Sequence, residues 1–492
     1  MNKDNMPTQN NFYPQNSIRS DFAIAMSQMY REEVPLYQDL LDVVEEINSE
    51  LINSNEISEE GITDLSRINL ERHGAIRLGS KEELNLISRL FNVLGMEPVG
   101  YYDLSIADLP VHSTVFRPVK RDDLKENPFR IFCSVLRPEL LDSEIQEKVK
   151  EVIASRNIVS EKCLSLITKF EEESGLDEED SKDFVKEALE IFRWHKNARI
   201  SKGFYKELLS INSLLADIVA FKGPHINHLT PRVLDIDLLY QRMSEKGINM
   251  TATIQGPPRR KIPILLRQTS FRALNEEILF PDIEGSELLG THRARFGEIE
   301  KRGAALTPKG LGLYNELLNK VLIEVKQSDS NYLEKLAESF KAFPDDIESL
   351  VKETLVYFSL SVDEDTDSLK AKLEKIPQIS QQISMIQNLI EKDSTYIFKP
   401  EFVEVLLSLQ LAGVIKIELL TYEDFLPVSA AGIFKSNIVE GGYVKAKDGQ
   451  ELSSQEDLEK ALTKKILDPF KDYEAESLAS IKAGLEKISN LL

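Results

Sequence analysis

Cysteine is scarce in this chain of 492 residues, which contains only Cys133 and Cys163. Two thiols cannot build a disulfide framework, and they cannot supply a cysteine-based zinc site. This sparing use of cysteine is typical of proteins that work in a reducing compartment. We therefore expect a cytoplasmic location.

Long apolar runs are also absent from the sequence. No stretch approaches the run of about 18 apolar residues that a membrane-spanning helix needs. The first residues, MNKDNMPTQNNFYPQNS, contain no apolar segment of the kind found in secretory signals. We expect neither a signal peptide nor a membrane span.

Basic charge is in deficit, because 60 Lys and Arg residues face 82 Asp and Glu residues and leave a formal net charge of −22. Such a chain lacks the basic surface of a general nucleic-acid binder, and anionic membranes repel it. The expected partners are therefore small molecules, with no nucleic acid and no membrane. The sequence leaves the oligomeric state open.

Two β-α-β blocks, each followed by a long helical stretch, organise the chain and form an internal repeat. This pattern predicts an α+β protein. A helix within the first block is expected to begin at Ser80, a good N-cap residue, and to end near Gly95. The predicted divisions are an N-terminal tail with helices (1–68), a first β-α-β module (69–121), a helical insertion (122–222), a second β-α-β module (223–307), a second helical insertion (308–400), a β-rich segment that completes the pocket (401–450) and a C-terminal helix (451–492).

The opening strand of each block carries the pattern His-x-x-x-Arg, at His73 and Arg77 and again at His228 and Arg232. Alternate residues of a strand share a face, so each histidine and its arginine point to the same side. A single strand histidine is usually a hydrogen-bonded core residue. The same residue at the same point of two repeats instead favours one shared site.

The remaining histidines are weaker candidates. His225 lies three residues before His228 and so faces the opposite side of a continuous strand, where it is expected to support the site or the fold. A surface or packing role suffices for His195, which lies in a charged helical stretch. His112 and His292 are alternates.

Arginine side chains in these strands have simpler interpretations as well. Arg77 could form an ion pair at the end of its strand. Arg232 could support the site, or it could pair with Asp235 and Asp237, which follow it closely.

A third ligand can come from the segment RARFGEIEKRG, which offers Glu298 and Glu300. Two imidazoles and one carboxylate form the facial arrangement of non-haem iron(II) oxygenases. A buried carboxylate must be paired or metal-bound, because an isolated buried charge is too costly. On the residues alone either glutamate can be the ligand, and two exposed acids on an edge strand remain the simpler alternative.

A β-α-β module that opens with such a histidine strand resembles the vicinal oxygen chelate superfamily, which is built from paired βαβββ modules. The segment FGEIEKR is similar to the last strand of its 4-hydroxyphenylpyruvate dioxygenase branch. More specifically, the chain resembles the 2-oxoadipate dioxygenase/decarboxylase family, also called 2-hydroxyglutarate synthases. That resemblance rests on seven segments in order between residues 71 and 434: HGAIR, GPHINHLTPR, GPPRR, ILLRQTSF, THRARFGEIEKRG, ALTPKG and YEDFLPVSAAGIF.

This resemblance implies two vicinal-oxygen-chelate-like βαβββ modules around a metal site, with large helical insertions. It implies iron(II) bound by His73, His228 and Glu298, which leaves Glu300 as a residue behind the ligands. It further implies that Arg77 binds a substrate carboxylate and that Val428 shapes the pocket.

The activity implied by the resemblance is conversion of 2-oxoadipate and O2 to 2-hydroxyglutarate and CO2 in lysine degradation. Two other classes stay open. The same ligands could bind zinc or nickel in an isomerase or lyase of the glyoxalase type, which needs no O2. The fold could also serve as a ligand-binding protein without catalysis, and oxygen uptake separates the dioxygenase from both.

Overall fold

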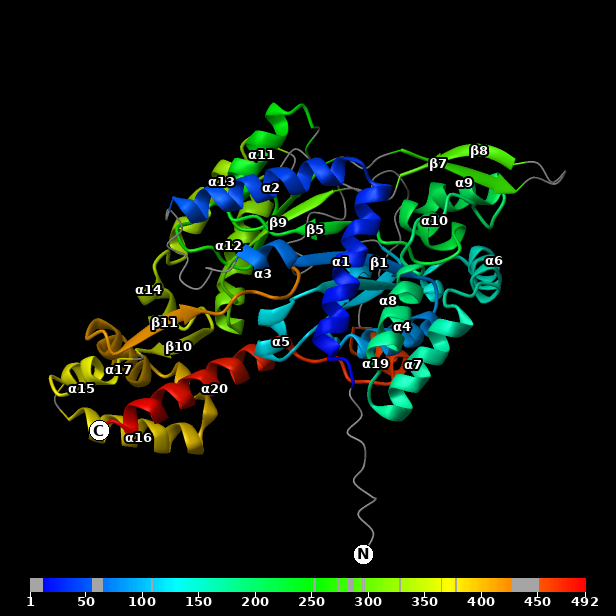
Figure 1. The fold of residues 1–492 in the computed structure, drawn as a ribbon. Helices are drawn as coiled ribbons and strands as arrows, with labels where there is room; N and C mark the ends of the chain where they lie inside the picture. The colour runs from blue at the N-terminus through cyan, green and yellow to red at the C-terminus, as the bar shows by residue number, and fades with distance from the viewer. Residues whose placement is uncertain are drawn as a thin grey trace, which may run out of the picture.

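The computed structural model is an α+β protein in which helices surround mixed β-sheets (Figure 1). No helix among the described residues is long and apolar enough to cross a membrane. The structure describes residues 12–54, 65–107, 109–248, 250, 254–271, 275–281, 287–293, 295, 297–326, 329–363, 365–376, 378–426 and 451–492.

A five-stranded sheet with the order β2-β3-β4-β1-β5 forms the centre of the molecule. Strand β1 (Arg72–Leu78) is followed by α4 (Lys81–Val93) and β2 (Glu97–Asp103). Strands β3 (Val111–Arg117) and β4 (Arg130–Leu136) complete this β-α-β-β-β unit. Within it, β1 is parallel to β4, and the pairs β4–β3 and β3–β2 are antiparallel.

The second half resembles this unit but contains an additional strand. Strand β5 (Leu229–Pro231) is antiparallel to β1 and is followed by α11 (Ile236–Glu245). Strand β6 (Leu266–Ser270) is antiparallel to β9 (Glu298–Arg302), and a parallel bridge joins Arg232 to Glu300 beside β5. In both halves the first strand therefore runs parallel to the last one. Between β6 and β9 lies a hairpin of β7 (Glu276–Pro281) and β8 (Glu287–His292).

The two faces of the central sheet pack against different hydrophobic clusters. Alternate residues of β4 divide between them, with Ile131 and Cys133 in one cluster and Phe132 in the other. One face is covered by α1 (Gln15–Glu33), α2 (Leu36–Asn53), α4, α7 (Glu161–Glu173) and α8 (Glu178–Leu189). The other face is covered by α6 (Ser143–Ala154), α9 (Lys202–Ile211), α10 (Ser213–Ala220) and the β7–β8 hairpin.

A further hydrophobic cluster joins the C-terminal helices to a two-stranded sheet, on the left of Figure 1. Strands β10 (Phe358–Val362) and β11 (Ile415–Leu419) are antiparallel in this part. Its helices are α12 (Pro308–Glu324), α13 (Tyr332–Ser339), α14 (Ile347–Lys352), α15 (Thr366–Leu373), α16 (Ile379–Lys392), α17 (Pro400–Leu411) and α20 (Pro469–Ser489). Among the described residues, the remaining α-helices are α3 (Leu65–Leu70), α5 (Arg121–Glu126) and α19 (Glu451–Leu462).

Several expectations from the sequence are confirmed. The fold is α+β, and α4 begins after Ser80, whose side chain accepts a hydrogen bond from the Glu83 backbone N–H. Helices also fill most of the two stretches predicted to be helical insertions. The predicted domain boundaries stay predictions.

Four parts of the predicted pattern are wrong. Strands β4 and β10 lie within stretches expected to be helical, 122–222 and 308–400. Conversely, the first part of the expected β-rich segment is helix α17. This helix begins at Pro400, a position that suits proline, and Gly413 follows its end with a positive φ of 68°. The expected single C-terminal helix is the two helices α19 and α20.

Candidate metal centre

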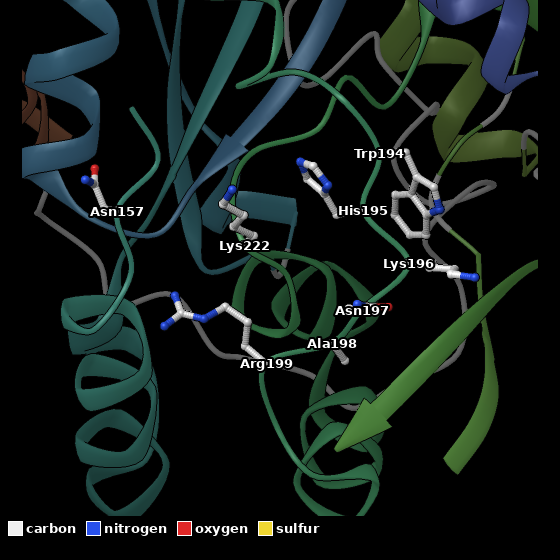
Figure 2. A pocket seen from close by; sticks show the side chains of 8 residues that line it. All are labelled: Asn157, Trp194, His195, Lys196, Asn197, Ala198, Arg199 and Lys222. Carbon is white, nitrogen blue, oxygen red and sulfur yellow. The ribbon is translucent and has the colours of Figure 1, made fainter. Parts of the chain in front are cut away.

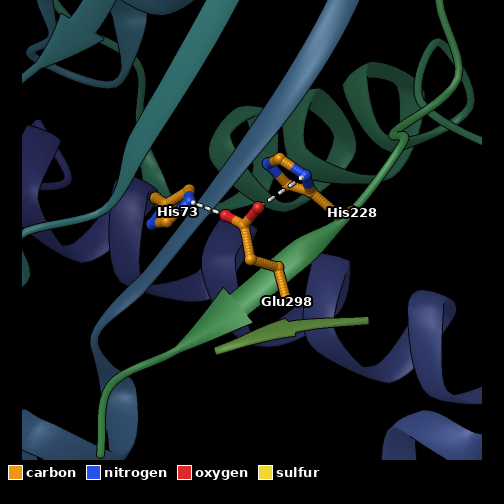
Figure 3. A group of neighbouring side chains, drawn as sticks. All are labelled: His73, His228 and Glu298. Atoms are coloured by element: carbon orange, nitrogen blue, oxygen red, sulfur yellow. Dashed lines mark hydrogen bonds and ion pairs between the residues drawn. The ribbon is translucent and has the colours of Figure 1, made fainter. Parts of the chain in front are cut away.

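Three buried side chains from separate strands converge at the centre of the molecule. His73 lies in β1, His228 directly precedes β5, and Glu298 begins β9. One ligand atom from each lies within 4.8 Å of the other two. Figure 3 shows both imidazoles turned toward the carboxylate. We call these residues the His–His–Glu trio.

Pairing between strands creates this convergence. His73 pairs with Thr230 across the β1–β5 ladder, and β9 lies on the other side of β5. The imidazole centroids of His73 and His228 are 5.4 Å apart. His73 Nε2 lies 3.0 Å from Glu298 Oε1, His228 Nδ1 lies 4.0 Å from Glu298 Oε2, and Thr230 Oγ1 donates to Glu298 Oε1 at 3.2 Å.

Burial and neighbouring charges set the pKa values of His228 and Glu298 in a way that favours binding of a cation. Burial lowers the pKa of His228 to about 4, so its imidazole is neutral near pH 7, which is the form that binds metals. Burial raises the pKa of Glu298, but His228 and His73 outweigh burial and bring it below its usual value. Two imidazoles and one ionised carboxylate suit a divalent transition metal, so the trio can hold one.

Glu300 lies behind His73. Its Oε2 is 3.0 Å from His73 Nδ1, and Arg302 donates to both of its oxygens, at 2.7 and 2.9 Å. Burial raises the pKa of Glu300, but Arg302 and His73 outweigh burial and lower it to about 2. An ionised Glu300 keeps the Nδ1 proton on His73, so Nε2 faces Glu298. Burial lowers the pKa of His73, yet Glu300 and Glu298 outweigh burial and raise it.

A buried ionic network extends from Glu300 and Arg302 across the sheet. Glu71 accepts hydrogen bonds from Arg130 at 3.0 Å and from Arg232 at 3.0 Å. Arg130 also contacts Glu423, which comes from the segment after β11. Charges buried this deeply require partners, and here acids and arginines from both halves supply them.

Of the two alternatives for Arg232, the structure does not show the pairing with Asp235 and Asp237. Arg232 binds Glu71 instead. Asp235 caps α11, where it accepts from the backbone N–H of Asp237, and the Asp237 carboxylate pairs with Arg267 at 2.6 and 3.0 Å. Helix α11 begins directly after Asp235, so the Asp235 side chain caps the N-terminus of the helix instead of pairing with Arg232.

Aromatic rings cover one side of the trio. The Phe425 ring lies 4.7 Å from the His73 ring and 5.2 Å from Phe132, whose ring is in turn 5.3 Å from Tyr102. These rings give the site an apolar wall that excludes water. Val428, expected to shape the pocket, lies outside the described residues.

Arg77 forms an ion pair with a residue that the sequence analysis missed. Its Nη1 lies 2.5 Å from Asp217 Oδ2, and the side chains of Arg77 and Asp217 are 15% and 3% exposed. Asp217 also contacts His225 Nε2 at 3.2 Å and His292 Nε2 at 2.8 Å. One signal in the sequence points to Asp217: it is the only charged residue in the apolar helix SLLADIVA, where a lone charge needs a partner.

The histidines outside the trio have separate environments. His225 joins Asp217, as expected for a residue that faces away from His228. His112 is buried beside Tyr101, whose hydroxyl lies 3.5 Å from His112 Nδ1. His195 lines a surface pocket of about 650 Å³ (Figure 2). The lining of that pocket is Asn157, Trp194, His195, Lys196, Asn197, Ala198, Arg199 and Lys222, which includes no member of the trio.

Comparisons with known proteins indicate the family of this chain. Residues 22–437 match the family model described as 2-oxoadipate dioxygenase/decarboxylase. The chain is 44% identical to the 2-oxoadipate dioxygenase/decarboxylase of Pseudomonas putida, with 98% of each chain covered. It is 42% identical to the Escherichia coli protein of that name, covering 95% of this chain and 98% of the relative.

A solved structure shares the fold over almost the full length. The hydroxyglutarate synthase from Pseudomonas putida in complex with 2-oxoadipate superposes with a TM-score of 0.83 at 41% identity. The match covers 97% of this chain and 99% of that one. The chain therefore belongs to the 2-oxoadipate dioxygenase/decarboxylase family.

Proposed function

We propose that this protein converts 2-oxoadipate and O2 to 2-hydroxyglutarate and CO2 at a metal centre formed by His73, His228 and Glu298. The observation that carries this proposal is the buried His–His–Glu trio, in a chain of this family. The related Pseudomonas putida protein binds 2-oxoadipate in its structure, which supports the same substrate here. Both atoms of O2 are retained in the two products, so no separate reductant is consumed.

The β-α-β unit that opens each half supports interpretation of the two halves as vicinal-oxygen-chelate-like modules. In both halves the first strand is parallel to the last, and a histidine in β1 and another directly before β5 belong to the trio. This pseudo-symmetry supports a site between the halves.

Iron(II) is the metal that fits this reaction. When bound, iron supplies the electrons that activate O2 for attack on a 2-oxo acid. His73, His228 and Glu298 would hold the ion, and Glu300 would keep the proton on His73 Nδ1. Phe425 and Phe132 would keep bulk water from the reacting carbons.

Arg77 would bind the far carboxylate of the substrate. Its pair with Asp217 uses Nη1, and a guanidinium has further N–H groups for a second carboxylate. The strand carries Arg77 four residues beyond His73, about 13 Å along β1. We expect the long Arg77 side chain to cover part of this distance, so that a dicarboxylic acid bridges the metal centre and the guanidinium, with Val428 in the wall between them.

Oxygen consumption tests this function. After anaerobic iron reconstitution, an oxygen electrode should record one O2 consumed for each 2-oxoadipate, with equal CO2 release. His73→Ala should lose both iron and activity, whereas His195→Ala, in the separate pocket, should retain both. Turnover of 2-oxo acids without O2 would instead indicate an isomerase or lyase. Binding without turnover would indicate a binding protein.

Substitution of Arg77 tests substrate selection. Arg77→Lys should lower kcat/KM for 2-oxoadipate by about 30-fold or more, since a lost charged hydrogen bond costs on the order of 2–5 kcal/mol. The iron content should be unchanged, because Arg77 is not a ligand. An Arg77→Lys enzyme with normal kcat/KM, or a wild type that uses 2-oxohexanoate equally well, would contradict the assigned role. Val428→Ala should change the tolerance for substituents along the substrate chain.

A further inference from the structure

A buried acid lies between Arg77 and two histidines that do not belong to the His–His–Glu trio. Asp217 comes from α10, whose residues 214–220 are all buried. Its Oδ2 faces Arg77 Nη1 at 2.5 Å, and its Oδ1 faces His292 Nε2 at 2.8 Å and His225 Nε2 at 3.2 Å. Each carboxylate oxygen thus has its own set of partners.

The two histidines are themselves held in place. Tyr205 Oη lies 2.7 Å from His292 Nδ1. The Trp194 ring stacks on His292 at 5.8 Å with an interplanar angle of 10°, and it meets His225 edge-on at 4.7 Å. This packing fixes both imidazoles, and through them it fixes the orientation of the Asp217 carboxylate.

Asp217 is a charged partner for Arg77. Burial raises the pKa of Asp217, but His225 and Arg77 outweigh burial and hold the pKa well below its usual range. An ionised carboxylate at 2.5 Å confines a guanidinium far more tightly than water does. The position of Arg77 therefore depends on the position of Asp217.

This cluster is also connected to the trio. Arg77 and His73 lie on the same strand, β1. Asn227, the neighbour of His228, donates to Asp217 Oδ2 at 3.3 Å and bonds through its backbone N–H to the Ala75 carbonyl at 3.0 Å. The carboxylate is thereby tied to both strands that carry the histidines of the trio.

We propose that Asp217 is the positioning residue for Arg77, and that His225 and His292 fix Asp217 so that the guanidinium meets the far carboxylate of the substrate. The inference rests on the proposed role of Arg77 in substrate selection. Asp217 touches no reacting atom in this scheme. It selects dicarboxylic 2-oxo acids by keeping Arg77 at one distance from the metal centre.

A second metal ion is the competing interpretation of the same residues. Ligand atoms of Asp217, His225 and His292 also lie within 4.8 Å of one another. Arg77 already neutralises this carboxylate, and a cation bound there would be repelled by the guanidinium. The positioning role is therefore favoured, and metal stoichiometry distinguishes the two.

Asp217→Asn tests the proposal through substrate discrimination. The measured quantity is the ratio of kcat/KM for 2-oxoadipate to kcat/KM for 2-oxohexanoate, a monocarboxylic acid of the same chain length. We expect this ratio to fall by about tenfold or more, mainly through KM for 2-oxoadipate, with the iron content unchanged. Asp237→Asn is the matched control, because it removes the carboxylate of another Asp–Arg pair, and should leave the ratio unchanged.

An Arg77→Met background separates this proposal from the role of Arg77 itself. Arg77→Met should lower the ratio, and adding Asp217→Asn should then lower it no further, because Asp217 acts through Arg77. If Arg77→Met leaves the ratio unchanged, the proposed substrate role of Arg77 is wrong. If Arg77→Met lowers the ratio and Asp217→Asn alone does not, only the positioning role is wrong.

His292→Phe provides a second route if Asp217→Asn fails to fold. It removes the donor to Asp217 Oδ1 and leaves the ion pair with Arg77, so the ratio should fall by a smaller factor. An unchanged ratio in a folded, iron-loaded His292→Phe enzyme would overturn the role of the histidine. Reconstitution with iron(II) or zinc(II) should give one metal per chain. A second equivalent that Asp217→Asn abolishes would overturn the positioning role in favour of a metal site.

Discussion

Glu300 is a buried side chain that contacts the His–His–Glu trio without belonging to it. It accepts from Arg302 on one side and lies against His73 Nδ1 on the other. Groups that hold a metal-binding imidazole in this way tune its orientation and its basicity. The two glutamates of the GEIEKR segment therefore have different tasks, although they are only two residues apart.

Glu300→Gln should weaken metal binding by about 10–100-fold, since an amide cannot hold the Nδ1 proton with a negative charge. Metal titration monitored by competition with a chelator measures this change. Glu97→Gln, a substitution of an exposed glutamate that pairs with Lys464, is the control and should bind metal normally. If Glu300→Gln bound metal as tightly as wild type, Glu300 would not orient His73.

His112 should make folding stability depend on pH. Burial, aided by the charge of Arg137, lowers its pKa from 6.5 to about 4. The unfolded chain therefore binds a proton between these values that the folded chain does not, so stability is lost as the pH falls from 6.5 toward 4. The loss attributable to His112 approaches about 3 kcal/mol at the lower end.

Chemical unfolding of wild type and His112→Gln between pH 4 and pH 7 checks this prediction. The difference in unfolding free energy between the two proteins should shrink as the pH falls through this window. A constant difference would show that His112 does not titrate there. Catalysis is not needed for the measurement.

Strand periodicity is enough to predict much of the site at the residue scale. It separates His228 from His225, and the repeat of His-x-x-x-Arg links His228 to His73 from the sequence alone. Asp217 escapes such reasoning because its helix supplies no motif, and its partners lie 140 residues earlier at Arg77 and 75 residues later at His292. Contacts between residues so far apart in the sequence produce no periodic pattern that a single sequence would reveal.

Strand β1 and the chain around β5 approach each other closely at the metal centre. A Cβ added at Gly74 would lie 3.0 Å from the carbonyl oxygen of His228 and 2.6 Å from the Ile226 side chain. Glycine permits this approach, and the approach sets the separation of the two imidazoles. The spacing of the ligands is thus a property of two backbones.

Gly74→Ala should push these backbones apart and weaken metal binding, with a lower Tm as well. The side chain of Ile226 can move, but the backbone of His228 can yield only by shifting the ligand that it carries. Gly312→Ala is the control, because a Cβ at that helical position meets nothing within 4 Å. The metal affinity and the Tm of both variants test this prediction. A normal metal affinity in Gly74→Ala would show that the close approach of the two backbones does not determine metal binding.

Elements with alternating or helical periodicity are predictable, and strands buried on both faces are not. Strand β4, RIFCSVL, is buried at every position, so it shows no alternation and resembles part of a buried helix. It also stands between helices α5 and α6, which favours a helical interpretation. Helix α17 is mistaken for β structure for the related reason that VEVLLSLQL is rich in apolar residues on several sides.

For the whole molecule, a metal that joins three strands should act as a cross-link. A metal present at about 100 times its dissociation constant adds about 2.7 kcal/mol to the free energy of unfolding, provided that it binds only the folded state. Thermal unfolding with manganese(II) or anaerobic iron(II) should therefore give a higher Tm than unfolding with a chelator.

His73→Ala should abolish this stabilisation, while Asp217→Asn should retain it. The opposite pattern would place the ion in the Asp217, His225 and His292 cluster. Because both groups contain two histidines and one acid, only this pair of variants distinguishes them by stability.

The ligands of the trio are also far apart in the order in which the chain is made, because 225 positions separate His73 from Glu298. At usual translation rates the ribosome needs roughly 10–45 s to travel from one to the other. Throughout that interval the nascent chain has the first histidine but not the complete trio, and the edge of β1 stays open until β5 has been made. Under the proposed function, the complete trio can bind metal only after Glu298 has been made, so the metal supply from that moment on decides how many molecules become active.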